Sequence, residues 1–305
     1  MQHLIAATSF ARGPGGTPAY TVIGDTRDVL GEGPIWSQQE QVLYWVDIRG
    51  KKVRRHRPAT GETKSWDVPE VPGSLALRAG GGVMVALRSG AYLFDPDSGK
   101  LTRAFLPDDH GPAMRFNDGK CDPGGRFWVG SMNDQIGAPD GILYRIEHSG
   151  KFVPVLRGIT TPNSLCWSPD GRTMYFADSA QFTLWAFPFD PASGDIGERR
   201  VVLRTAPPGV PDGAAVDTEG CVWFAMHDAW QIVRCTPQGE IIQVLSTPAQ
   251  LPTAVAFGGP ELRTLYVTTK FYQLTEEQLR IQPLAGALLA LDVGVQGLPE
   301  PCFEG

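Results

Sequence analysis

Six positions along the chain carry an unusual share of side-chain oxygens at a regular spacing. They recur every 41 to 49 residues and are Glu32, Gly73, Asn117, Asn163, Asp212 and Thr253. We call these six residues the ring positions. If the fold brings them together around one axis, Glu32 and Asp212 repel each other and lose hydration, which costs several kcal/mol unless a cation or protons compensate. Carboxylate and amide oxygens are the ligands that a hard divalent cation prefers.

We therefore expect one divalent metal ion, with Glu32, Asn163 and Asp212 as direct ligands. Asn117 either binds the ion itself or contacts one of the ligands. Any one of these residues alone would be explained by a strand end or turn, where Asn, Asp and Gly are common. Four in register favour a cation instead, and Ca²⁺, Zn²⁺, Mn²⁺, Mg²⁺ and Fe²⁺ all remain open.

A sixfold repeat predicts how these positions converge. Each unit has a short strand, a turn with Gly or Asp, and an aromatic-rich strand; the units span residues 35–47, 74–87, 118–130, 164–177, 213–225 and 254–268. A second hairpin follows, for example at 92–105 and 232–244. A period of 40 to 50 residues is typical of a propeller, and a β-sandwich does not predict it. We predict an all-β, six-bladed β-propeller with four antiparallel strands per blade, whose innermost strands carry the ring positions.

The last blade lacks a strand in the sequence after residues 288–293. The stretch 20–23 precedes the first unit and has no partner, so we predict that this N-terminal strand closes the last blade. The whole chain, 1–305, is then a single propeller domain, with residues 1–18 as a flexible N-terminal extension. A short helical turn is expected within 274–279, over the mouth of the channel.

Composition excludes several classes of partner. A net charge of −6 argues against nucleic acid, and the basic run 51–57 is interpreted as a solvated edge strand. Five cysteines without a CxxC spacing indicate free thiols in a reducing compartment. Residues 1–16 show neither a signal peptide nor a membrane span, so we expect a cytoplasmic protein that does not bind a membrane. The oligomeric state is not readable.

Around the ring positions the sequence resembles the SMP-30/gluconolactonase family, which includes regucalcin and bacterial sugar lactonases. The matching motifs are LGEGP at 30–34, RFNDGK at 115–120, NSLCWSPDG at 163–171 and PDG at 211–213. With their spacings they cover roughly residues 20–303. The resemblance implies a six-bladed propeller with a single divalent metal that hydrolyses aldonolactones to aldonic acids.

Carried over by position, the resemblance makes Glu32, Asn163 and Asp212 metal ligands and Asp212 also the general base. It makes Arg115 and Asn117 contacts to the sugar hydroxyls or the lactone. One departure is that animal members bear a substrate-contacting glutamate on a longer loop after the third inner hairpin. The corresponding stretch, 132–140, has no glutamate, so the preferred lactone, pentono- or hexono-, stays open.

The chemistry expected is ester hydrolysis, in which a cation stabilises the oxyanion and Asp212 accepts a proton from water. A serine nucleophile is disfavoured because there is no GxSxG motif. The five histidines, His3, His56, His110, His148 and His227, lie outside the ring positions and are interpreted as surface or turn residues. Two alternatives are a metal-dependent hydrolase of other esters or phosphotriesters, and a non-catalytic calcium-binding propeller.

Overall fold

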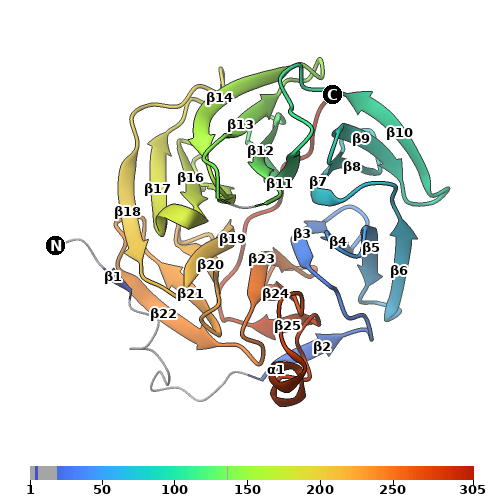
Figure 1. Cartoon of the computed structure of the whole chain (residues 1–305), viewed down its shortest axis with the longest axis vertical. Coiled ribbons are helices and arrows are strands. Elements are labelled where there is room, and N and C mark those ends of the chain that lie inside the picture. The colour runs from blue at the N-terminus through green and yellow to red at the C-terminus, as the bar shows by residue number, and fades with distance from the viewer. Residues whose placement is uncertain (1–3, 6–18, 136) are drawn as a thin grey trace.

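Six antiparallel sheets radiate from a central axis in the computed structural model, which describes residues 4–5, 19–135 and 137–305 (Figure 1). The strands of each sheet follow one another outward from the centre (Figure 1). The exceptions are the two N-terminal strands, β1 (Leu4–Ile5) and β2 (Thr21–Ile23), which lie at the outer edges of two sheets. The predicted all-β, six-bladed propeller is therefore confirmed. Most of the predicted extension, residues 1–18, lies outside the described residues, and only Leu4–Ile5 is placed, as strand β1 along β18.

The strands follow one plan from blade to blade. Blade 1 has β3 (Gly31–Ser37), β4 (Val42–Asp47), β5 (Lys52–Arg57) and β6 (Glu62–Asp67). Blade 2 has β7 (Pro72–Leu77), β8 (Val83–Leu87), β9 (Gly90–Asp95) and β10 (Lys100–Phe105). Blade 3 has β11 (Met114–Cys121), β12 (Phe127–Asn133), β13 (Gly141–Ile146) and β14 (Phe152–Ile159).

Blades 4 to 6 repeat this plan. Blade 4 has β15 (Pro162–Trp167), β16 (Thr173–Asp178), β17 (Thr183–Pro188) and β18 (Arg200–Thr205), with a 3₁₀ turn, η1 (Ser179–Gln181), after β16. Blade 5 has β19 (Val210–Val216), β20 (Val222–His227), β21 (Gln231–Cys235) and β22 (Ile241–Ser246). Blade 6 has β23 (Pro252–Gly258), β24 (Thr264–Thr269), β25 (Leu288–Asp292) and β2 (Thr21–Ile23).

The ring closes through the N-terminal strand, as predicted. Strand β2 pairs antiparallel with β25, joining Thr21 to Ala290 and Ile23 to Leu288. The hydroxyl of Tyr20 also donates a hydrogen bond to the carbonyl of Ser246, 2.9 Å away in blade 5. Blade 6 is thus built from both ends of the propeller, which ties the first and last blades together.

Deleting residues 1–24 is expected to destabilise the protein, whereas deleting residues 1–18 is not. The longer deletion removes three cross-strand pairs and uncovers β25, a loss of about 2–3 kcal/mol at about 0.2–1 kcal/mol per pair plus the uncovered edge. At about 2–4 °C per kcal/mol for a large domain, the midpoint of thermal unfolding falls by about 5–10 °C. Calorimetry on both truncations measures this, and equal midpoints would disprove the closure.

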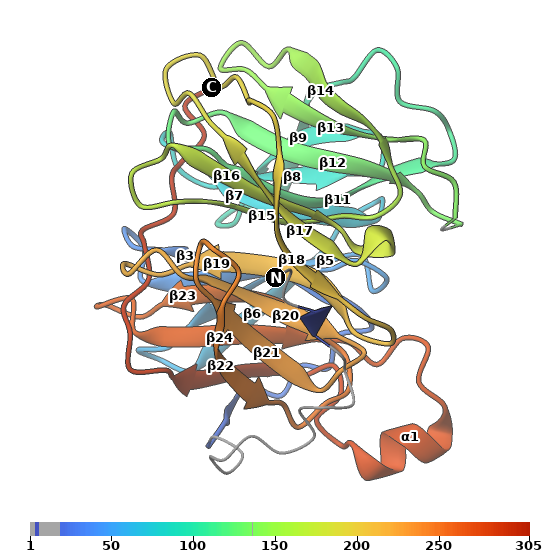
Figure 2. The same ribbon diagram turned by 90° about the vertical axis from the view of Figure 1, so that its left-hand side faces the viewer.

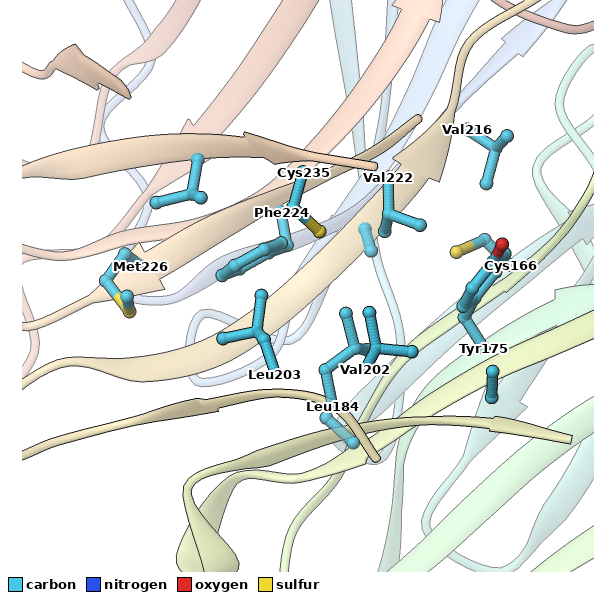
Figure 3. Close-up of a cluster of buried hydrophobic side chains, with 14 of the residues drawn as sticks. Cys166, Tyr175, Leu184, Val202, Leu203, Val216, Val222, Phe224, Met226 and Cys235 are labelled. Carbon is cyan, nitrogen blue, oxygen red and sulfur yellow. The ribbon is translucent and has the colours of Figure 1, made fainter. Parts of the chain in front are cut away.

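The core lies between neighbouring blades. Figure 3 shows the cluster between blades 4 and 5, where Tyr175 and Leu184 from one sheet face Val222 and Phe224 from the next. Because the inner strands are covered on both faces, β4, β8 and β15 are buried along their whole length. The outermost strands β6 and β10 have no buried residue. The aromatic-rich runs of the sequence are therefore the second strands, packed between blades.

The basic run 51–57 is not a solvated edge strand, and that interpretation was wrong. It forms β5, which lies between β4 and β6, and Arg54, Arg55 and His56 are buried. Arg54 donates to Asp28, 2.6 Å away, and the same carboxylate accepts from the indole of Trp45. Burial of Arg54 is tolerated because a carboxylate that is distant in sequence pairs with its guanidinium group.

The two mouths of the central channel differ. The C-terminal segment runs across the ring (Figure 1), bridging Gly297 to Asp217 and Phe303 to Arg78. The opposite mouth is the one that the ring positions face. Helix α1 (Glu276–Ile281) confirms the predicted helical turn, which is capped by Thr275. It stands out at the edge of the molecule (Figure 2), and none of its residues lines the cavity at the mouth. No helix in the described part of the chain is long and apolar enough to cross a membrane.

Candidate active site

A β-bulge or similar irregularity marks the ring position in all six blades. The pairing of the first strand with the second shifts there, between 32 and 35, 72 and 74, 116 and 119, 163 and 166, 211 and 214, and 252 and 254. A bulge breaks the alternation of a strand and re-aims a side chain. Gly33 and Ser164, each next to a ring residue, have φ values of +54° and +60°. The repeated irregularity turns the ring side chains toward the channel mouth.

The predicted site residues meet in one cavity of about 300 Å³. Its lining includes all five of them: Glu32, Arg115, Asn117, Asn163 and Asp212. All five are at most 7% exposed, so the site lies within the mouth rather than on the surface. The volume suits a small ligand of about monosaccharide size.

Of the other two ring positions, Thr253 lines the cavity and Gly73 does not. The hydroxyl of Thr253 donates to the carbonyl of Gly31, which ties blade 6 to blade 1 beside Glu32. At Gly73 a Cβ atom would lie 2.4 Å from the carbonyl oxygen of Phe116. Glycine stands there because the backbone of blade 3 passes too close for any side chain.

A directed chain of hydrogen bonds fixes the two amides. Arg115 Nη1 donates to Asn117 Oδ1 at 2.8 Å, and Asn117 Nδ2 donates to Asn163 Oδ1 at 2.9 Å. Asn163 Nδ2 then donates to Ser179 Oγ at 2.8 Å, whose hydroxyl donates to the carbonyl of Pro211 at 2.6 Å. Every amide orientation in this chain is set by its neighbours. The oxygen of Asn163 consequently keeps one acceptor position for another ligand.

The two carboxylates of the site are electrostatically unfavourable as they stand. Burial, followed by the charges of Asp212 and Asp118, holds the pKa of Glu32 well above its usual range. Burial likewise raises the pKa of Asp212, although the charge of Lys270 opposes this and that of Asp118 adds to it. Two buried carboxyl groups that are costly to ionise together form a place where a cation would be stabilising.

The residues present fit a hard cation. Among the described residues no three His, Cys, Asp or Glu side chains gather as a metal cluster. An ion here would therefore need neutral oxygen in addition to the carboxylates of Glu32 and Asp212. The fixed amide oxygen of Asn163 provides it, and such an all-oxygen set is typical of Ca²⁺ or Mg²⁺ sites and also accepts Mn²⁺.

A second ring of residues was not predicted from the sequence. Its members lie at, or within two residues of, the end of the second strand of each blade: Arg49, Arg88, Asp134, Ser179, His227 and Lys270. Because the second strand runs antiparallel to the first, its end returns to the mouth where the first strand begins. Ser179, His227 and Lys270 line the cavity, together with Gln273 just before α1. None of the residues of α1 lines it.

The interpretation of the histidines as surface or turn residues was wrong for two of them. His56 is buried in β5. His110 lies half-buried in a loop, in agreement with the prediction, and stacks on Phe116 with ring centroids 4.6 Å apart. His227 ends β20 and lines the cavity, where burial, and then the charge of Lys270, lowers its pKa to about 3. His227 is thus a neutral imidazole at the mouth. His148 is exposed, as predicted, and His3 lies outside the described residues.

Comparison with known proteins agrees with this geometry. Residues 30–271 match the model of the SMP-30/Gluconolactonase/LRE-like region. The chain is 39% identical over 280 residues to 6-deoxy-6-sulfogluconolactonase of Pseudomonas putida, covering 91% of this chain and 96% of that one. It is 34% identical over 292 residues to pentonolactonase XacC of Haloferax volcanii, covering 92% and 96%.

The solved structures show the same architecture. The crystal structure of a calcium-binding protein, regucalcin, from Agrobacterium tumefaciens superposes with a TM-score of 0.91 at 27% identity, covering 100% of both chains. The family model spans well over half of the chain, and the curated relatives exceed 30% identity over nearly their whole length. This chain belongs to the SMP-30/gluconolactonase/LRE-like family.

Proposed function

We propose that the protein hydrolyses a sugar lactone to the aldonic acid, with the help of one divalent cation. The observation that carries this proposal is the single cavity in which Glu32, Asn163 and Asp212 face Arg115 and Asn117. It combines an oxygen-rich cation site with groups that bind hydroxyls. The names of the relatives, a sulfogluconolactonase and a pentonolactonase, support the same reaction class.

Glu32, Asn163 and Asp212 would hold the cation. When bound, it would supply positive charge beside the lactone carbonyl, where negative charge develops during hydrolysis. The similarity to a calcium-binding regucalcin supports Ca²⁺ as one candidate, and the other divalent ions named above are compared with it by titration.

Asp212 is proposed as the general base. It takes a proton from the attacking water while the water oxygen bonds to the carbonyl carbon. The ring C–O bond then breaks, and the ring oxygen leaves as a hydroxyl of the acid after taking up the proton. Asp212 sits next to Pro211, whose carbonyl ends the hydrogen-bond chain from Arg115, so the base and the substrate-binding groups share one rigid frame.

Arg115 and Asn117 are proposed to position the substrate. Asn117 already donates both hydrogens of its amide, to Asn163 and to the carbonyl of Pro162. Its remaining capacity is as an acceptor from a sugar hydroxyl. Arg115 uses Nε and Nη1 within the protein, and among the described residues no acceptor is bonded to its Nη2. That group is the natural donor to a lactone oxygen.

The test is acid release from a panel of pentono- and hexonolactones, neutral and charged, followed with a pH indicator. We expect at least one lactone to be opened with a kcat/KM in the ordinary enzymatic range of about 10⁴–10⁸ M⁻¹s⁻¹. Simple aryl esters and phosphotriesters serve as comparison substrates. Turnover of those compounds alone would replace the proposed function, and no turnover of any would favour a calcium-binding propeller. We also propose a cytoplasmic location, since all five cysteines are unpaired.

A further inference from the structure

Three arginines from three different blades converge on one carboxylate at the rim of the site. Asp134 Oδ1 lies 2.9 Å from Arg115 Nε and 3.1 Å from Arg49 Nη2, and Asp134 Oδ2 lies 2.5 Å from Arg88 Nη2. Arg49 follows β4, Arg88 follows β8 and Arg115 is in β11. Asp134 comes from the stretch 132–140, in which the sequence shows no counterpart to the glutamate of the animal proteins.

The cluster formed by Asp134 and the three arginines has an excess of positive charge. One carboxylate faces three guanidinium groups, so two positive charges remain in a chain whose net charge is −6. Burial favours the neutral form of Asp134, but the hydrogen bond from Arg88 and the charges of Arg115 and Arg49 outweigh it and lower its pKa. Asp134 is thus a full anion that is already saturated with donors.

Lys270, in blade 6, lies near the other carboxylates of the mouth. Burial lowers its pKa, and the charges of Asp212, Glu32 and Asp228 oppose this shift. Its ammonium also lies 5.9 Å from the ring of Tyr272, and the guanidinium of Arg49 lies 5.2 Å from the same ring. The excess positive charge therefore lies with Arg49 and Arg88. These two arginines do not line the cavity themselves but adjoin it through Asp134, which pairs with the lining residue Arg115.

Arg49 and Arg88 remain accessible to a ligand. Their side chains are 26% and 33% exposed, whereas that of Arg115 is 6% exposed. Arg88 also lines a neighbouring hollow of about 320 Å³ with Arg103 and His110. A single carboxylate would suffice to hold Arg115 in place, so two further, partly exposed arginine side chains are better explained by an anion that binds them from solvent.

We propose that the lactone carries a second, anionic group, a phosphate, sulfonate or carboxylate, which binds Arg49 and Arg88. This inference rests on the proposed lactonase function and names the class of its substrate. We place the reacting carbonyl near Asp212 and Asn163. Nη1 of Arg115 connects to this side through Asn117, whereas its Nε pairs with Asp134, the carboxylate that Arg49 and Arg88 also bind. The anionic group consequently belongs at the end of the sugar remote from the ring carbonyl.

The first experiment compares matched substrates on the unmodified protein. Glucono-1,5-lactone, its 6-phosphate and its 6-deoxy-6-sulfonate differ only at the remote end. Glucaro-1,4-lactone, compared with glucono-1,4-lactone, tests a carboxylate at that end. We expect kcat/KM at least about tenfold higher for a charged lactone than for the neutral one. Raising the salt concentration should shrink this preference, because screening weakens partly exposed charge pairs. Calorimetry should likewise show tighter binding of 6-phosphogluconate than of gluconate.

The second experiment removes the charges singly and together as Arg49→Gln and Arg88→Gln. Each variant should lower kcat/KM for the charged lactone by about tenfold or more and change that for the neutral lactone by less than about threefold. The matched control is Arg157→Gln, an exposed arginine of blade 3 paired with Asp109, which should leave both values unchanged. Equal losses on charged and neutral lactones would show that the two arginines only support Asp134.

The outcomes separate this inference from the function on which it rests. If no lactone is opened, the proposed function fails. If neutral and charged lactones are opened equally well, or the product acids bind equally, the function stands and the anionic substrate class is overturned. A preference for one charged lactone that vanishes in Arg88→Gln supports the inference and identifies which anion the rim selects.

Discussion

The Asp212→Asn protein is expected to turn over lactones at least about three orders of magnitude more slowly than the unmodified protein. General base catalysis contributes about 10²–10⁴-fold, and the substitution also removes one of the two charges proposed to hold the cation. Asparagine has nearly the shape of aspartate, so the fold should be unaffected. Initial rates of acid release measure the effect, and the content of bound metal in the purified variant separates loss of the base from loss of the ion.

Asp228→Asn provides the matched control for this substitution. Asp228 directly follows β20 in blade 5, close to the same mouth. Its carboxylate accepts a hydrogen bond from Gln250, and the residue does not line the cavity. Its φ value is +66°, a conformation that asparagine tolerates well. The control should retain its rate within a few-fold. An Asp212→Asn protein that kept a near-normal rate would exclude Asp212 as the base.

The fold could be predicted because the propeller repeats itself in the sequence. Each inner hairpin has the same length within a few residues, so the ring positions align without gaps. The closing strand was predictable for a related reason: blade 6 was short of a strand, and residues 20–23 had no partner. Both conclusions depend on counting strands and do not require any knowledge of side-chain packing.

The site residues at the start of the first strands were predictable, but the site residues that follow the second strands were not. Glu32, Asn163 and Asp212 begin the first strands, where the register is regular. Arg88, Asp134, Ser179 and Lys270 follow the second strands, where loops of different lengths begin and residue types do not repeat. The antiparallel pairing of the first two strands nevertheless places them at the same mouth. Taking the residue after each second strand as a further ring would have found them.

Buried arginines escaped prediction because their partners are far away in sequence. In blade 5, Arg234 donates to Asp217 at 2.8 Å, and Trp223 donates to the same carboxylate. In blade 1, Arg54 and Trp45 share Asp28 in the same way. A run of basic residues is typical of a solvated surface only where no carboxylate lies within reach of the arginines. A single sequence does not show which carboxylate the fold brings to them.

Removal of divalent metal by a chelator is expected to abolish turnover and to lower the midpoint of thermal unfolding. An ion present at 100 to 1,000 times its dissociation constant stabilises the folded state by about 3–4 kcal/mol. This corresponds to about 6–16 °C for a large domain. Activity and midpoint should both return on adding back the cognate divalent ion, and titrating Ca²⁺, Zn²⁺, Mn²⁺, Mg²⁺ and Fe²⁺ in parallel identifies it.

The effect of the chelator should depend on pH in a definite direction. In the metal-free protein, burial raises the pKa values of Glu32 and Asp212, and the charge of Asp118 adds to both shifts. The folded chain therefore retains protons that the unfolded chain releases above about pH 4. The metal-free protein therefore loses stability as the pH rises from about 4 through the raised values. A bound cation compensates the ionised carboxylates, so the difference between the two unfolding midpoints should widen from pH 5 to pH 8. A chelated protein with full activity and an unchanged midpoint would show that these buried carboxylates are balanced by protons, and that the reaction proceeds without a metal ion.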